Sequence, residues 1–64
     1  MEGWKLIGQS RTGIDLEMQK ALLWEKGEIH AVVMNKKLSA YDLGNWELYV
    51  HQDDEEEALN LLKD

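Results

Sequence analysis

Residues 28–50 read EIHAVVMN (28–35), KKLSAYDLGN (36–45) and WELYV (46–50). The first and last of these segments are rich in β-branched and aromatic residues and show alternation, which is typical of half-buried strands. The middle segment contains turn-forming residues and is longer than an ordinary hairpin loop. This pair of strands decides the fold, because the remainder of the chain adds only one strand and two helices.

Residues 4–9 predict the first strand, bounded by glycine and by a polar turn. Thr12 and Asp15 have the spacing of a capping box, which predicts a helix from Gly13 to about Lys26, with Gly27 as its stop. Residues 55–62 predict a second helix. The order is β-α-β-β-α in a single domain of residues 1–64. We therefore expect an α+β fold, ferredoxin-like but truncated by one strand: a three-stranded antiparallel sheet with two helices on one face.

Alternation along the strands assigns each side chain to one face of this sheet. The side toward the helices receives Trp4, Leu6, Ile29, Ala31, Val33, Trp46, Leu48 and Val50. The open face receives Lys5, Ile7, Gln9, His30, Val32, Met34, Glu47, Tyr49 and His51. Within the open face, an apolar strip of Ile7, Val32, Met34 and Tyr49 is predicted to bind a partner. The missing last strand also leaves the first strand as an unpaired edge that can recruit another chain.

The helix predicted over residues 13–26 is apolar on more than one side. Ile14, Met18 and Leu22 share one face with Ala21, whereas Leu16 and Leu23 lie roughly opposite and Trp24 sits on a flank. One set has to face away from the core. Either the small domain wraps around part of both sets, or the outer set is a stripe that binds a partner.

Composition excludes several classes of function. The 64 residues contain no Cys, which rules out a disulfide, a thiolate zinc site and a cysteine nucleophile. Thirteen acidic and seven basic residues give a formal charge of −6, which opposes binding to nucleic acid or to an anionic membrane. No segment has the length of a signal peptide or a membrane span. We therefore expect a cytoplasmic protein that binds neither nucleic acid nor membrane.

Candidate chemistry is sparse, and we expect no enzyme activity, metal or cofactor. The hairpin would bring His30 and His51 near one another on the open face, as a metal site, a pH-sensitive contact or two exposed polar side chains. The acidic run at residues 53–57 has two interpretations. It could meet a cation or a basic partner, or its carboxylates could stabilise the first turn of a helix. Its spacing does not match a calcium loop.

Asn35-Lys36, Ser39, Tyr41, Gly44 and the run ELYV (47–50) resemble a family of small bacterial domains described as prokaryotic signal-transducing proteins. The resemblance covers nearly the whole chain and is tightest over residues 31–50. It implies a ferredoxin-like or regulatory-protein-like fold and a non-enzymatic role. Where many members have Asp-Ser-Ser-Tyr, this chain has LSAY (38–41), which removes two polar groups from any anion- or metabolite-binding loop.

Two hypotheses of function follow. The first is a non-enzymatic regulatory or signal-transducing module that binds a protein partner, or a second copy of itself as a homodimer. It would use the strip of Ile7, Val32, Met34 and Tyr49, or the edge of the first strand. The second is a small-ligand sensor in which the loop of residues 36–45 forms a lid, with Lys37 and Tyr41 contacting the ligand.

Overall fold

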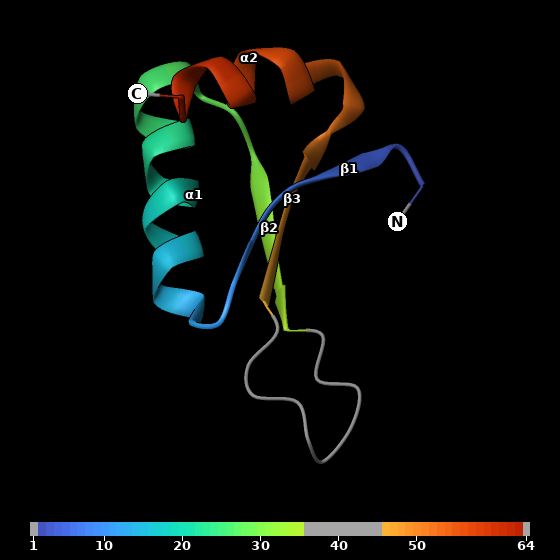
Figure 1. The fold of residues 1–64 in the computed structure, drawn as a ribbon. Helices are drawn as coiled ribbons and strands as arrows, with labels where there is room; N and C mark the ends of the chain where they lie inside the picture. Colours follow the sequence, from blue (N-terminus) through green and yellow to red (C-terminus); the bar gives the residue numbers. More distant parts are fainter. Residues whose placement is uncertain (1, 36–45, 64) are drawn as a thin grey trace.

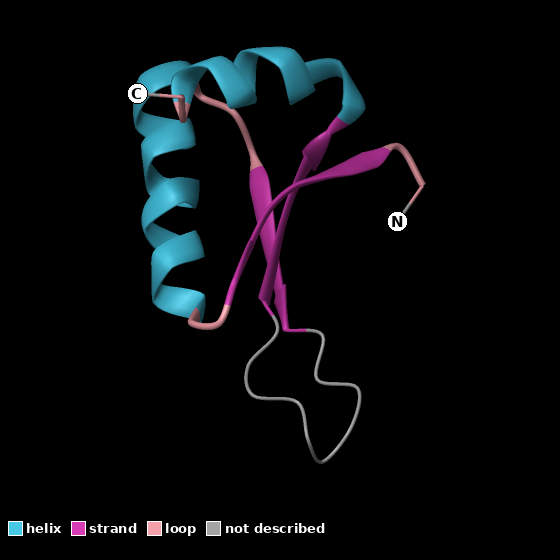
Figure 2. Ribbon diagram, in the orientation of Figure 1, coloured by secondary structure: helices cyan, strands magenta, loops and turns pink. Residues whose placement is uncertain are grey.

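The computed structural model describes residues 2–35 and 46–63 of the chain (Figure 1). Its elements follow the order β-α-β-β-α, which confirms the α+β prediction (Figure 2). They are β1 (Trp4–Ser10), α1 (Gly13–Gly27), β2 (Ala31–Asn35), β3 (Trp46–His51) and α2 (Glu55–Leu61), with a short 3-10 turn, η1 (Gln52–Asp54), before α2. Lys37 and Tyr41, the predicted ligand contacts, lie outside the described residues.

The three strands form one antiparallel sheet in the order β1-β3-β2. This is the ferredoxin-like order without its last strand, as predicted. Figure 1 shows α1 running along the sheet, with α2 lying across one end of α1. Within the described ranges, neither helix is long and apolar enough to cross a membrane.

The register of the central hairpin confirms the predicted core face. Ala31 pairs with Val50, and Val33 pairs with Leu48, so these four side chains point to the same side. Leu48 and Val50 are completely buried, at 0% exposure. Residues from both helices, from the segment before β2 and from β2 itself complete the core: Leu16, Leu23, Ile29, Ala31 and Ala58 join Leu48 and Val50.

The face assignment of β1 was wrong. Leu6 lies opposite Tyr49 but Gly8 lies opposite Leu48, so Ile7 is an extra residue in the ladder, a β-bulge. Ile7 packs against the core, whereas Leu6 is 43% exposed. Trp4 lies opposite His51, on the open side of the sheet. The bulge reverses which side chains of β1 face the core. A prediction that assumes strict alternation along the strand cannot include this reversal.

Both ends of α1 lie close to where the sequence places them, but the capping contacts differ. Thr12 is the residue before the first turn, and its hydroxyl donates a 3.0 Å hydrogen bond to Asp15 instead of accepting one from the backbone. The hydroxyl of Ser10 donates to the same carboxylate oxygen at 3.0 Å and accepts from the Thr12 N–H at 3.2 Å. The predicted reciprocal capping box is therefore replaced by a cluster of three side chains.

The left-handed residue that ends α1 is Glu28, at φ 53°, and not the glycine before it. The Glu28 N–H donates to Trp24 O at 2.8 Å, and the Ile29 N–H donates to Leu23 O at 3.1 Å. These bonds satisfy carbonyls of the last turn. They also turn the chain so that Ile29 enters the core, and β2 begins only at Ala31.

Candidate functional site

The open face of the sheet carries a cross-strand row of three apolar or aromatic side chains. Tyr49, on the central strand, lies between Leu6 on β1 and Val32 on β2. Met34 lies opposite Glu47 in the neighbouring row. The predicted strip is therefore retained for Val32, Met34 and Tyr49. Leu6 takes the position that had been assigned to Ile7, which the bulge turns toward the core.

The side chain of Tyr49 is hydrogen-bonded to a residue of its own strand, β3. Its hydroxyl donates a 2.7 Å hydrogen bond to Glu47 Oε1. That bond, followed by desolvation and by the negative charge of Glu47, raises the pKa of Tyr49 above its usual value of 10.0. The hydrogen bond orients the phenol toward Glu47 on the open face.

The two histidines have separate partners. His51 meets the Trp4 ring edge-on at 5.9 Å between centroids, and its Nδ1 accepts a 3.2 Å hydrogen bond from the Asp53 N–H. His30 instead lies against Trp24, with the centroids 5.0 Å apart. In the described part of the chain, no three His, Asp or Glu side chains are grouped so that they could hold a metal ion.

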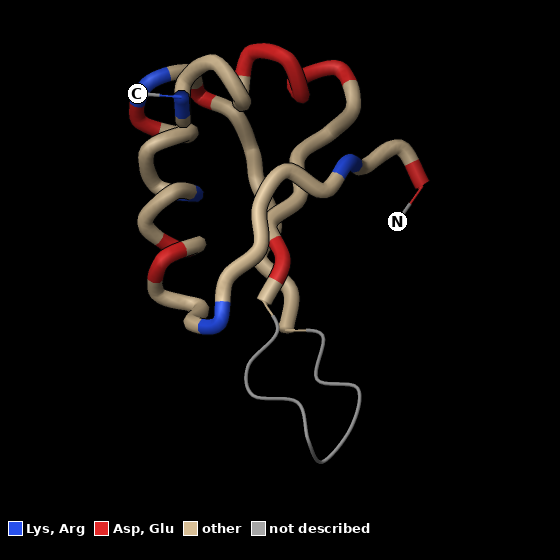
Figure 3. The backbone as a smooth tube through the Cα atoms, in the orientation of Figure 1, with Lys and Arg blue, Asp and Glu red and all other residues tan. Residues whose placement is uncertain are grey.

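The acidic run falls in η1 and in the first turn of α2, where Figure 3 shows Asp and Glu gathered. Carboxylates at this position interact favourably with the unpaired N–H groups of the helix. Their placement agrees with that structural interpretation of the run.

The outer face of α1 carries large apolar side chains. Ile14, Met18 and Leu22 follow one another at intervals of one turn and are 68%, 63% and 39% exposed. Leu16 and Leu23, on the opposite face, are at most 1% exposed. The core therefore contains the smaller apolar set, Leu16 and Leu23. The larger set, hereafter the α1 stripe (Ile14, Met18 and Leu22), is left outside, and the domain does not wrap around it.

A hollow of about 350 Å³ adjoins the α1 stripe on the side of β1. Met18 and Leu22 form part of its wall, and Leu16 closes it on the inside. The remaining lining is polar and comes from Gln9, Ser10, Asp15 and Gln19. The stripe therefore continues into a concave surface instead of ending on a convex helix.

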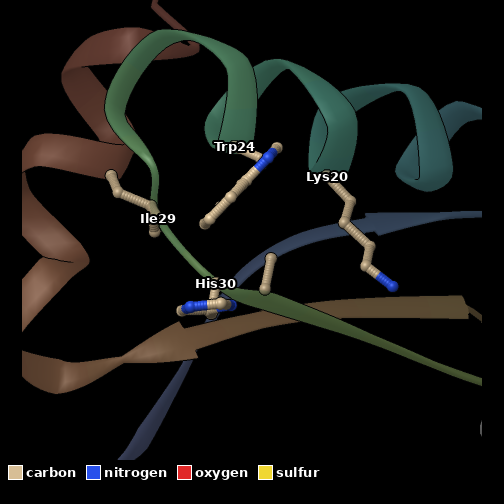
Figure 4. A pocket seen from close by; sticks show the side chains of 5 residues that line it. Lys20, Trp24, Ile29 and His30 are labelled. Carbon is tan, nitrogen blue, oxygen red and sulfur yellow. The ribbon is translucent and has the colours of Figure 1, made fainter.

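A second hollow, of about 250 Å³, lies on the other side of α1, next to β2 (Figure 4). Lys20 and Trp24 reach it from α1, while Ile29, His30 and Ala31 line it from the chain that enters β2. Ile29 and Ala31 are buried and give it an apolar floor, whereas Trp24 is 51% exposed. Reasoning from the sequence missed this site, because its residues belong to two elements and form no motif.

Comparison with known proteins identifies no relative: no family model, no curated protein and no solved structure matches this chain.

Proposed function

We propose that this chain is a non-enzymatic binding module that acts through contacts with another protein. One observation carries the proposal: the outer face of α1 exposes Ile14 and Met18 by more than 60% each, at positions where a surface helix ordinarily carries polar residues. Contiguous apolar side chains on a surface are typical of interaction sites. The hollow beside Met18 and Leu22 gives such a partner a place to insert a side chain.

The charge around the α1 stripe favours a basic partner. Glu17 and Glu25 are exposed and lie three residues after Ile14 and Leu22, and Asp15 lines the adjoining hollow. Lys26, four residues after Leu22, is the one cation of α1 on this side, so acidic groups outnumber it. The chain as a whole carries −6, so two copies would bring together twice that charge. We therefore favour a partner helix with an apolar face flanked by Lys and Arg over a second copy of this chain. Self-association remains a measurable alternative.

The regulatory or signal-transducing role, the cytoplasmic location and a bacterial origin are parts of the same proposal. The role and the bacterial origin are supported by the resemblance in sequence described above. The open face, with Val32, Met34 and Tyr49, is proposed as a second contact area for a partner.

The test uses a synthetic helix with leucines along one face and lysines on its flanks, titrated against the full chain by calorimetry. We expect binding, and we expect Met18→Gln to weaken it about tenfold because the substitution removes apolar surface without adding charge. Leu59→Gln is the matched control, since Leu59 is 46% exposed on α2, outside the stripe. The same helix with glutamates in place of lysines should bind less tightly.

Three outcomes would count against the proposal. The first is that the basic helix does not bind the wild-type chain. The second is that it binds Met18→Gln as tightly as the wild type. The third is that Leu59→Gln lowers the affinity as much as Met18→Gln does. Light scattering at several concentrations tests the alternative, in which a second copy of this chain binds the α1 stripe. A dimer that Met18→Gln dissociates would show that a second copy covers the stripe.

A further inference from the structure

The edge of the sheet at β2 is open in the described part of the chain. β2 pairs with β3 only, since it is the last strand in the order β1-β3-β2. Its five residues pair consecutively with β3, from Ala31 opposite Val50 to Asn35 opposite Trp46. β1, the other edge, is interrupted by the bulge at Ile7. Because a regular edge offers evenly placed N–H and C=O groups, β2 is the better template for an added strand.

The hollow of Lys20, Trp24, Ile29, His30 and Ala31 lies at the start of this edge, because Ala31 is the first residue of β2 and Ile29 and His30 precede it. Figure 4 shows Trp24 and Lys20 extending from α1 toward β2, with His30 below Trp24. A strand added to β2 and continuing past Ala31 would therefore bring side chains of one face to this space. Recognition of this kind combines backbone hydrogen bonds to an edge strand with side-chain pockets between that strand and a helix.

The size of the hollow favours a side chain over a free small molecule. At about 250 Å³ it is smaller than the pockets of 300–1,000 Å³ that enclose drug-sized ligands. It is lined by an exposed indole and an apolar floor, which suit one large apolar or aromatic side chain. Lys20 lines the same hollow and supplies a positive charge to it.

The spacing of the two α1 residues matches that of a strand. Lys20 and Trp24 are separated by one helical turn, a rise of about 6 Å. Alternate residues of a strand, which point to the same face, lie about 6.6 Å apart. An extended segment can therefore present an aromatic side chain to Trp24 and a carboxylate to Lys20 from positions two residues apart.

We infer that β2 accepts an extended segment of a partner protein as an added strand, with an aromatic or large apolar side chain against Trp24 and an acidic side chain near Lys20. This inference goes beyond the proposed function, because it uses the opposite side of α1 and a different mode of recognition. Either can fail without the other.

The probe is a phage-displayed library of random dodecapeptides selected on the full chain, followed by calorimetry and amide NMR on the enriched peptides. We expect enrichment of an aromatic residue two positions from Asp or Glu, and amide shifts concentrated in Ala31–Asn35. Trp24→Ala should weaken binding about tenfold, and Lys20→Gln should do so only for peptides that contain the acidic residue. Leu59→Gln, on α2 and outside both proposed sites, is the control and should bind normally.

Methylating single backbone nitrogens of the peptide tests strand addition independently of any substitution in the protein. Binding should fall at alternate positions only, since alternate N–H groups face the neighbouring strand. The inference is overturned if no peptide is enriched over selection on an unrelated protein, or if methylation has no alternating effect. It is also overturned if Trp24→Ala binds as well as the wild type.

Discussion

Gly27 and Leu61 approach so closely that a Cβ on Gly27 would lie 2.8 Å from Leu61 Cδ1. The same Cβ would lie 3.3 Å from Glu57 Oε2 and 3.4 Å from Ile29 Cδ1. Gly27 has an ordinary helical backbone, so its role is to let α2 pack across the end of α1 and not to turn the chain. The left-handed turn falls one residue later, on Glu28.

Gly27→Ala should therefore destabilise the fold, although Ala is the better helix former by about 1 kcal/mol. The added methyl group displaces Leu61 from its packing against the core, and overpacking of this kind costs about 1–3 kcal/mol. Urea unfolding measures the difference. A higher free energy of unfolding for Gly27→Ala would mean that the Leu61 side chain moves aside without loss of stability.

Glu28→Gly should have the opposite effect. A non-glycine residue in the left-handed region costs about 1 kcal/mol, and glycine removes that strain at the position where helices most often carry it. We expect the free energy of unfolding to rise by about 0.5–1 kcal/mol in the same urea experiment. A lower stability would show that the Glu28 side chain contributes more than its backbone strain costs.

The bulge in β1 predicts unequal effects at neighbouring positions. Ile7→Ala removes side-chain contacts with the core and should cost about 1–3 kcal/mol of unfolding free energy. Leu6→Ala should cost less than about 1 kcal/mol, because Leu6 is 43% exposed on the open face. Regular alternation would give the reverse order, so the pair of variants tests the bulge directly.

Tyr49 should make stability fall at high pH. Its hydrogen bond to Glu47 raises the pKa in the folded state above 10.0, so the folded chain holds the phenol proton more tightly than the unfolded chain. The stabilisation is complete below pH 10.0 and is lost as the pH rises through the folded-state pKa. Absorbance titration of Tyr41→Phe, which leaves Tyr49 as the only tyrosine, measures this pKa.

In that background, Glu47→Gln should lower the titration midpoint of Tyr49 toward 10.0, because it removes the charged acceptor. An unchanged midpoint would assign the shift to some other cause.

Met34 allows a test of the open face that separates binding from folding. Because Met34 lies opposite Glu47, Met34→Glu places two carboxylates on neighbouring strands and should cost about 0.2–1 kcal/mol of stability. Met34→Lys places opposite charges there and should not. Both variants remove apolar surface, so both should lower the affinity for any partner that contacts this face. Loss of binding in Met34→Glu alone would point to folding as its cause.

The sequence by itself determined the features that depend on short-range chemistry. The order of the elements follows from local period and turn residues. The pairing of Ala31 and Val33 with Val50 and Leu48 follows from alternation within one hairpin, where one strand fixes the parity of the other. The start of α1 at Gly13 was likewise evident from the polar residues around Thr12.

Tertiary structure decided the features that depend on what packs against each element. The bulge at Ile7 reverses the facing of β1, since the ladder to β3 must place Gly8 opposite Leu48 beneath α1. The choice of Leu16 and Leu23 for the core leaves the α1 stripe exposed, although both apolar sets look alike in the sequence. The hollow of Trp24 and His30 exists only because α1 and β2 lie side by side. Each feature arises from packing between separate elements, about which local periodicity carries no information.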